Sequence, residues 1–141
     1  MHLPANSGVY FIGIGGISMS SLALILKRRG FRVAGYDFKP SETTQFLQQN
    51  GIPVYDTYAP EHQNGYETVV FTAAIAETDP ELICAKARGA VILSRAELLG
   101  ALVADYPHSI GIAGTHGKST TTGMLAHIFA HSDTDATILA G

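Results

Sequence analysis

The chain has 141 residues, of which 46% are apolar and 15% charged, so it can build the core of an ordinary domain and is not disordered by composition. Its net charge of −3, without any run of lysines and arginines, excludes the basic surface of a nucleic-acid-binding protein. The single cysteine excludes an intramolecular disulfide and fits a reducing compartment, so we expect a cytoplasmic protein. Residues 1–7 lack a secretory-signal pattern, and no stretch approaches the roughly 20 apolar residues of a membrane span, so we expect no membrane insertion.

Short β-rich runs alternate with helical patterns through the first hundred residues. The residues with β-branched and aromatic side chains predict strands at 9–12, 31–36, 53–55, 68–72 and 90–93. Apolar residues at helical spacing predict helices at 18–29, 42–50, 80–88 and 94–105, whereas the polar stretch 56–65 is expected to be a loop. Strict strand–helix alternation implies parallel strands with helices on both faces, the Rossmann-like, doubly wound α/β class.

Capping residues predict where two of these helices begin. Asp79 can cap the third helix, and Pro80 at the first helical position loses no hydrogen bond that the helix needs. The segment from Ser94 to Glu97 matches a capping box and opens the fourth helix. Pro107 then breaks the helical pattern, which places a domain boundary at about residues 105–108.

A second α/β pattern begins after this boundary. Residues 109–113 predict a strand, residues 114–118 a loop, residues 119–131 a helix, and residues 137–139 the beginning of another strand. One strand–loop–helix unit cannot bury both faces of its strand. We therefore interpret residues 1–105 as a complete domain and residues 106–141 as the truncated start of a second.

A glycine-rich loop follows the first strand and opens the first helix, which is the position of a dinucleotide-type phosphate loop. Glycine allows the tight turn and the close approach of a pyrophosphate, and the helix N-terminus offers free N–H groups to the anion. The candidate phosphate-binding residues are Gly13, Gly15, Gly16, Ile17 and Ser18, with Ser18 in place of the third glycine of the pattern. The loop predicts a nucleotide-diphosphate site, and the alternative is a tight turn whose glycines serve packing.

Two further residues are candidates for the same site. Asp37 ends the second strand about 20 residues beyond the loop, where a carboxylate can accept hydrogen bonds from ribose hydroxyls. Asp37 is equally interpretable as a turn or cap residue. Arg95 begins a helix and can reach a substrate phosphate or carboxylate, with a surface helix residue as the alternative.

The second glycine loop carries the stronger phosphate-binding pattern. A P-loop places glycine at the position of Ile112, whereas here Gly111 and Gly114 flank that position. We expect the ATP site at Gly114, Thr115, His116, Gly117, Lys118, Ser119 and Thr120. Lys118 is the expected catalytic residue because it would place positive charge on the β- and γ-phosphates, and the Ser119 hydroxyl would bind Mg²⁺.

The two loops together narrow the class of enzyme. A nicotinamide-dependent dehydrogenase needs the first loop alone, and a simple kinase needs the second alone. A chain with both suggests an enzyme that holds a nucleotide-linked substrate and consumes ATP.

The residues around both loops resemble the Mur ligases of bacterial cell-wall synthesis. The similar segments are residues 11–20, 35–37, 95–99 and 111–122, so the resemblance extends over nearly the whole chain. His116 is typical both of the members that add L-alanine to UDP-N-acetylmuramate and of the murein-peptide ligases. Residues 15–20 look more like the alanine-adding members, with murein-peptide ligases as the alternative. Two positions depart from many relatives: Ser18 stands for glycine, and Ser119 stands for threonine while keeping its hydroxyl.

The resemblance implies a three-domain enzyme whose N-terminal domain binds UDP, whose central domain binds ATP with Mg²⁺, and whose C-terminal domain helps to bind the amino acid. ATP would phosphorylate the lactyl carboxylate of UDP-N-acetylmuramate, and the amine of L-alanine would attack the acyl phosphate. The general base and the alanine pocket are not among these residues, so we expect this chain to bind ligands without catalysing. The competing classes are a nucleotide-binding module without ligase activity and a nicotinamide-dependent oxidoreductase.

Overall fold

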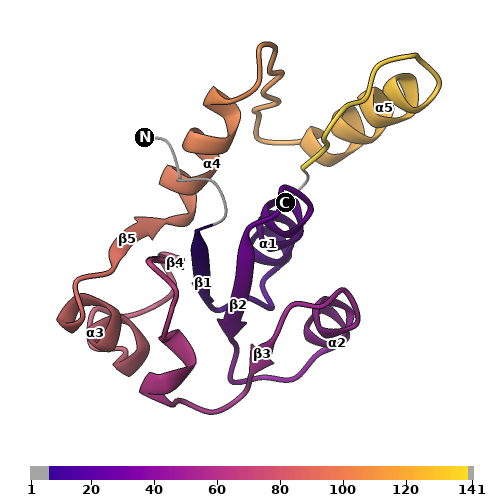
Figure 1. The fold of residues 1–141 in the computed structure, drawn as a ribbon. Helices are drawn as coiled ribbons and strands as arrows, with labels where there is room; N and C mark the ends of the chain where they lie inside the picture. Colours follow the sequence, from indigo (N-terminus) through magenta and orange to yellow (C-terminus); the bar gives the residue numbers. More distant parts are fainter. Residues whose placement is uncertain (1–6, 140–141) are drawn as a thin grey trace. The chain divides into compact units, whose positions relative to one another are not determined.

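The computed structural model describes residues 7–139, and the chain divides into two compact units, Met1–Asp105 and Tyr106–Gly141 (Figure 1). The first unit contains a five-stranded sheet, and the second contains one helix among its described residues.

The sheet of the first unit is parallel, with the strand order β3-β2-β1-β4-β5. Its strands are β1 Gly8–Ile12, β2 Arg32–Tyr36, β3 Val54–Tyr55, β4 Thr68–Phe71 and β5 Val91–Ser94. Its helices are α1 Ile17–Arg28, α2 Glu42–Gln49, the 3-10 helix η1 Pro60–Gln63, α3 Pro80–Ala87 and α4 Arg95–Ala104. The predicted α/β class and Rossmann-like parallel sheet are confirmed.

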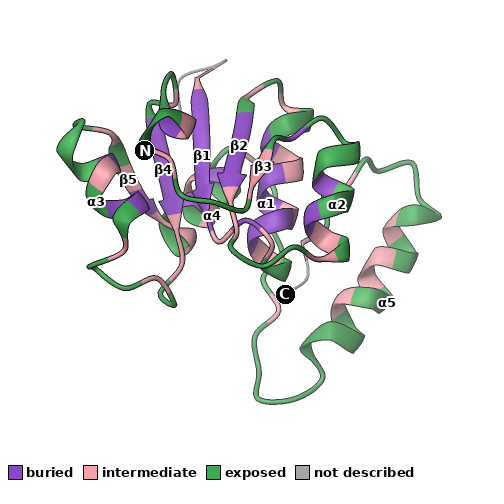
Figure 2. Cartoon of the chain, turned by 90° about the horizontal axis from the view of Figure 1, so that it is seen from below, coloured by how far each residue is buried: buried purple, intermediate pink, exposed green. Residues whose placement is uncertain are grey.

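The sheet is buried on both faces. Tyr10 and Ile12 of β1 pack in one cluster with Leu82 and Ala85 of α3. Neighbouring side chains of a strand point to opposite faces, so the equally buried Val9 and Phe11 must face the other side. Figure 2 shows the central strands coloured as buried and the helices with exposed outer surfaces. This burial explains why the strands read as continuous apolar runs instead of alternating ones.

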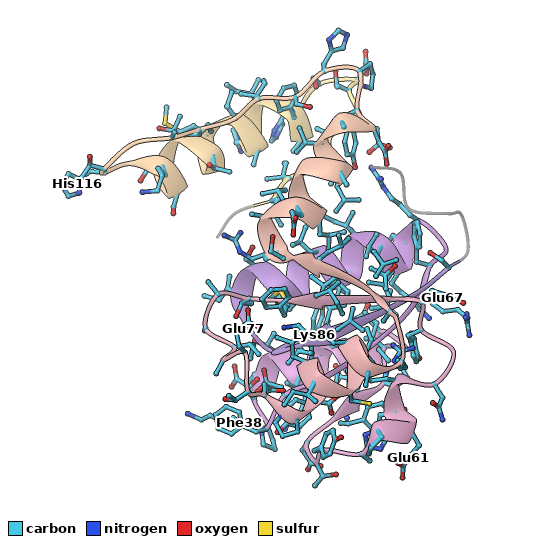
Figure 3. The ribbon with its side chains drawn as sticks, turned by 90° about the vertical axis from the view of Figure 1, so that its left-hand side faces the viewer. Phe38, Glu61, Glu67, Glu77, Lys86 and His116 are labelled. Atoms are coloured by element: carbon cyan, nitrogen blue, oxygen red, sulfur yellow. The ribbon has the colours of Figure 1, made fainter. Side chains whose placement is uncertain are left out.

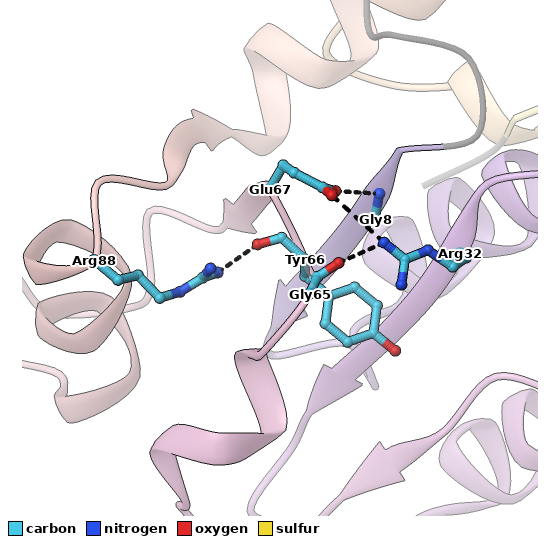
Figure 4. A network of polar contacts seen from close by, with 6 residues as sticks. All are labelled: Gly8, Arg32, Gly65, Tyr66, Glu67 and Arg88. Atoms are coloured by element: carbon cyan, nitrogen blue, oxygen red, sulfur yellow. Dashed lines mark hydrogen bonds and ion pairs between the residues drawn. The ribbon is translucent and has the colours of Figure 1, made fainter.

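Polar contacts tie the amino ends of three strands together (Figure 4). The amide of Gly8 donates to Glu67 Oε2 at 2.6 Å, and Nη2 of Arg32 donates to the carbonyl of Gly65 at 2.6 Å. Arg32 also forms an ion pair of 3.5 Å with Glu67. Nη2 of Arg88 adds a 2.6 Å bond to the carbonyl of Tyr66. The amide of Gly8 holds the pKa of Glu67 below its ordinary value, because it stabilises the charged carboxylate.

Two predictions for the second unit were wrong. The described residues contain no strand at 109–113 or at 137–139, where strands were predicted. A strand needs the backbone of a partner strand, and the described residues of this unit supply none. The predicted helix is present as α5 Lys118–Ala130, although none of its residues is buried. In the first unit, η1 lies within the stretch that was predicted to be a loop.

Candidate functional site

The candidate nucleotide site lies at the carboxyl edge of the sheet. Because all strands are parallel, the segments that follow β1, β2, β4 and β5 leave the sheet at this same edge. β2 and β3 lie on one side of β1, and β4 and β5 lie on its other side, so the strand order reverses between β1 and β4. Ligands of open α/β sheets bind outside the carboxyl ends at such a reversal.

The first glycine loop is bound to the end of β2. Gly13 has a φ of 80°, which only glycine adopts easily, and its amide donates to the carbonyl of Tyr36 at 2.8 Å. The amide of Gly15 donates to Asp37 Oδ2 at 2.8 Å. The amide of Lys39 donates to the other oxygen, Oδ1, at 3.1 Å. The structure thus brings two predicted site residues, Gly15 and Asp37, into direct contact.

The N-terminus of α1 has no side-chain cap. Gly16 is the N-cap residue, and no acidic residue lies in the first turn. The first intrahelical bond runs from the amide of Ser20 to the carbonyl of Gly16 at 2.8 Å. The amides of residues 17–19 therefore have no carbonyl one turn earlier to bind. Such amides, with the positive end of the helix dipole, favour a phosphate.

Arg95 reaches this helix from the end of β5. Its Nη1 donates to Ser18 Oγ at 3.2 Å, across 77 positions of sequence. Arg95 is the first residue of α4, which begins at the cap residue Ser94. The capping box predicted there is present: Ser94 Oγ accepts from the amide of Glu97 at 3.2 Å, and Glu97 accepts from the amide of Ser94 at 2.7 Å. Local capping thus sets the position from which Arg95 reaches α1.

The structure adds residues that the sequence patterns missed. Among the described residues, the most exposed large apolar side chain is Phe38 at 76%, which directly follows the predicted site residue Asp37. Ile17, which was itself predicted as a site residue, is 75% exposed. Figure 3 shows Phe38 and Glu77 on the opposite side of the first unit from Glu67. Ile75, in the segment after β4, lies 3.8 Å from the place that a Cβ of Gly13 would occupy. The position of Phe38, next to Asp37, which directly follows β2, was the available sequence signal.

The second glycine loop contains a hydrogen bond between its own residues. Gly114 and Gly117 have φ values of 158° and 78°, and Gly117 is the N-cap of α5. Lys118 Nζ donates to the carbonyl of Gly114 at 2.8 Å, so the lysine lies back over the loop. All seven residues predicted to bind ATP are solvent-exposed. The arrangement gives one cation, a helix N-terminus and a hydroxyl at Ser119 within one short segment, and these groups suit a polyphosphate.

Ser119 fits the way that Mg²⁺ binds beside a nucleotide. Mg²⁺ keeps several waters and takes few protein ligands, the remaining ones coming from phosphate oxygens. One hydroxyl at the start of α5 is therefore a sufficient contribution from this segment. Residues 7–139 contain no cluster of three or more His, Cys, Asp or Glu that could hold a metal without a phosphate. Within the same residues, no helix has the length and apolar character to cross a membrane.

The chain is similar to known proteins over nearly its whole length. The family model described as "Mur ligase family, catalytic domain" matches residues 8–107. A UDP-N-acetylmuramate–L-alanine ligase of Caldicellulosiruptor bescii is 50% identical over 132 residues, which are 94% of this chain and 29% of the relative. The chain thus spans less than a third of the length of that curated relative.

Solved structures show the same similarity. The crystal structure of a UDP-N-acetylmuramate-alanine ligase from Thermotoga maritima matches 88% of this chain and 29% of its own, with 31% identity and a TM-score of 0.82. A UDP-N-acetylmuramate:L-alanyl-gamma-D-glutamyl-meso-diaminopimelate ligase from Neisseria meningitides matches 89% of this chain and 40% of its own, with 30% identity and a TM-score of 0.80. The family model alone extends over more than half of the chain, and the chain therefore belongs to the Mur ligase family.

Proposed function

We propose that the protein to which this chain belongs is an ATP-dependent ligase that joins L-alanine to the carboxylate of UDP-N-acetylmuramate. In this proposal residues 1–105 bind the UDP-sugar, and residues 106–141 begin the ATP-binding domain. The observation that carries it is the convergence of Asp37 and Arg95, from the ends of two different strands, on the uncapped glycine loop after β1. The similarity to curated alanine-adding ligases supports the choice of substrate.

The UDP-sugar site is built around the N-terminus of α1. The diphosphate binds at the free amides of Ile17 and Ser18, where Gly13, Gly15 and Gly16 let the backbone approach closely. Arg95 adds a positive charge from α4, and an arginine can bind two phosphate oxygens at once. Asp37 accepts from the ribose through the lone pairs that the amides of Gly15 and Lys39 leave free. The base then extends past Asp37 towards the exposed ring of Phe38.

The second glycine loop binds ATP in the proposal. The amides of the loop and the N-terminus of α5 hold phosphate oxygens, Lys118 neutralises charge on the transferred phosphate, and Ser119 is a ligand of Mg²⁺. Mg²⁺, when bound with ATP, supplies further neutralisation of the phosphate charge. Lys118 must exchange its bond to the carbonyl of Gly114 for the phosphate, which is favourable because a charged acceptor binds an ammonium more strongly.

The proposed reaction has two steps. The γ-phosphoryl group of ATP passes to the carboxylate oxygen of UDP-N-acetylmuramate, which gives an acyl phosphate and ADP. The amine of L-alanine then attacks the acyl carbon, phosphate leaves, and the amine loses a proton to give an amide. Phosphoryl transfer depends mainly on positioning and charge neutralisation, which Lys118 and the loop amides supply. The single cysteine fits the reducing cytoplasm in which we place the reaction.

A murein-peptide ligase is the second candidate, and the Neisseria structure favours it almost as strongly as the Thermotoga structure favours the first. Both candidates share UDP-N-acetylmuramate and differ in the amine, so assays of the complete protein with L-alanine and with a peptide amine separate them. A nucleotide-binding module without ligase activity would give no amide with either amine.

Calorimetric titration of this chain with UDP, UDP-N-acetylmuramate, NAD and ATP tests the proposed site. We expect UDP and UDP-N-acetylmuramate to bind more tightly than NAD, and ATP to bind weakly. NAD binding that equals or exceeds UDP binding would overturn the proposal in favour of an oxidoreductase.

A further inference from the structure

Ser18 and Arg95 form the contact that connects α1 to α4 beside the proposed diphosphate position. The hydroxyl of Ser18 accepts from Nη1 of Arg95 at 3.2 Å, and both side chains are partly buried. Ser18 is the second residue of α1, so its side chain stands at the uncapped end of that helix. The guanidinium is therefore held close to the free amides of the first turn.

The partner of Arg95 is neutral, whereas two other arginines of the unit pair with carboxylates. Arg29 and Arg32 form ion pairs with Asp105 and Glu67 at 3.1 and 3.5 Å. Arg95 has no carboxylate within 4 Å among the described residues, and the first turn of α1 contains no acid. Its positive charge consequently remains available to a ligand.

A hydroxyl is well suited to hold such a guanidinium. Serine accepts one of the five N–H donors of arginine, and the planar fork keeps the other four for phosphate oxygens. A carboxylate at the same place would neutralise the charge and compete with the phosphate. An apolar residue would leave a long side chain free to move, and ordering it would oppose binding.

We infer that the side chain of Ser18 has a positioning role: its hydroxyl acts on the diphosphate of the nucleotide through Arg95 and not by direct contact. This inference rests on the proposed function and deepens it. It also gives a reason for serine at a position where the phosphate-loop pattern has glycine: the side chain fixes a cation that a glycine could not hold.

A double-mutant cycle on UDP affinity tests the inference. The variants are Ser18→Ala, Arg95→Ala and the two combined, each compared with the unmodified chain at two salt concentrations. We expect Ser18→Ala to weaken UDP binding about three- to tenfold and to lower its salt dependence, and we expect Arg95→Ala to lower that salt dependence as well. The combined variant should bind no more weakly than Arg95→Ala alone, because both changes remove one function.

Three comparisons complete the experiment. Ser21→Ala is the matched control, since Ser21 Oγ donates only locally to the carbonyl of Ile17 at 2.9 Å, and it should bind UDP normally. Ser18→Thr keeps a hydroxyl and should restore most of the affinity. Uridine lacks phosphate, so its binding should be equal in all variants. Urea unfolding of each variant confirms that the fold is intact.

The outcomes separate the inference from the proposed function. Additive losses in the cycle, or normal UDP binding by Ser18→Ala, would overturn the inference while leaving the UDP site in place. A loss in Ser21→Ala equal to that in Ser18→Ala would overturn it as well, because it would indicate a general effect on α1. No UDP binding by the unmodified chain would remove the proposed function and the inference together.

Discussion

The amide of Gly15 and the carboxylate of Asp37 lie 2.8 Å apart, and a Cβ on Gly15 would stand 2.6 Å from that same oxygen of Asp37. The glycine is thus required by a residue 22 positions away, not only by the turn in which it lies. The phosphate loop is thus in direct contact with Asp37, the residue proposed to bind ribose, and a side chain added at Gly15 would clash with it.

The first prediction concerns this contact. Gly15→Ala should push Asp37 out of place and weaken UDP binding about tenfold, which is about 1.4 kcal/mol. Calorimetry measures the affinity, and urea unfolding measures stability. Gly16→Ala is the stability control, because its Cβ would meet nothing nearer than 3.6 Å and should leave stability within about 0.5 kcal/mol. Unchanged UDP affinity in Gly15→Ala would show that the loop does not depend on Asp37.

The second prediction concerns the opposite edge of the sheet. A Cβ on Gly8 would lie 2.6 Å from the carbonyl oxygen of Gly65, which is backbone and cannot rotate away. Gly8→Ala should therefore destabilise the fold by about 1–3 kcal/mol, as overpacking does. Gly100→Ala is the matched control within α4, where a Cβ meets nothing within 4 Å. It should stabilise by roughly 0.5–1 kcal/mol, since alanine favours a helix interior. Equal urea midpoints for the two variants would contradict this account.

Local chemistry made most of the first unit predictable. The cap at Asp79 and the capping box at Ser94 set helix starts through neighbouring residues, and both are present as predicted. A second capping box, between Ser41 and Thr44, was missed because threonine is not the usual partner. The turn η1 was missed because its stretch has no apolar periodicity.

Non-local partners explain the remaining differences. The residues at 109–113 have the composition of a strand, yet a strand exists only beside another strand, and composition does not supply one. The glycine loop was predictable from its spacing, whereas the contact of Arg95 with Ser18 joins residues 77 positions apart. Such contacts depend on strand order, which no local pattern specifies.

The third prediction concerns Glu81, a buried acid on α3. Gln63 Nε2 donates one hydrogen bond to the side chain of Glu81 and another, at 2.8 Å, to the carbonyl of Glu81. The hydroxyl of Tyr10 donates to Glu81 Oε1 at 3.5 Å. Burial, the largest cause, raises the pKa of Glu81 above its ordinary value of 4.5. The folded state therefore favours the protonated acid more than the unfolded state does. The resulting contribution of Glu81 to the free energy of unfolding is fully present below pH 4.5 and is lost as the pH rises through the raised pKa.

Unfolding experiments over a pH series test that sign. The stability of the unmodified chain relative to Glu81→Gln should fall as the pH rises above 4.5, by at most about 1.4 kcal/mol per pH unit. Glu77→Gln is the control, because Lys86 holds the pKa of the exposed Glu77 below 4.5 and the expected pH trend has the opposite sign. A relative stability of Glu81→Gln that does not change with pH would exclude a raised pKa at this residue.

The fourth prediction concerns the base of the nucleotide. Phe38 follows Asp37 directly and is 76% exposed, and stacking of a base on an aromatic ring contributes about 1–3 kcal/mol. Phe38→Ala should lower the affinity for UDP and leave that for inorganic pyrophosphate unchanged. Phe46→Ala removes a ring that is 51% exposed on α2 and should alter neither affinity. Equal losses for UDP and pyrophosphate would mean that Phe38 supports the loop and does not contact the base.

The last prediction concerns Lys118, whose Nζ lies 2.8 Å from the carbonyl of Gly114 in the second unit. In a complete ligase that contains this chain, Lys118→Ala should lower turnover about 10²- to 10³-fold, or about 3–4 kcal/mol, because a preorganised charge at the transferred phosphate is lost. The affinity for UDP-N-acetylmuramate should stay nearly unchanged, because the residues proposed to bind it belong to the first unit.

A paired measurement separates this role from a structural one. Turnover is measured with ATP, UDP-N-acetylmuramate and L-alanine, and binding of the UDP-sugar is measured by calorimetry. Lys27→Ala, which removes an exposed lysine of α1, should affect neither quantity and controls for net charge. Near-normal turnover in Lys118→Ala would remove the catalytic role. A parallel loss of UDP-sugar binding would instead mean that the lysine supports the fold, since charge neutralisation at ATP alone leaves the other substrate's site intact.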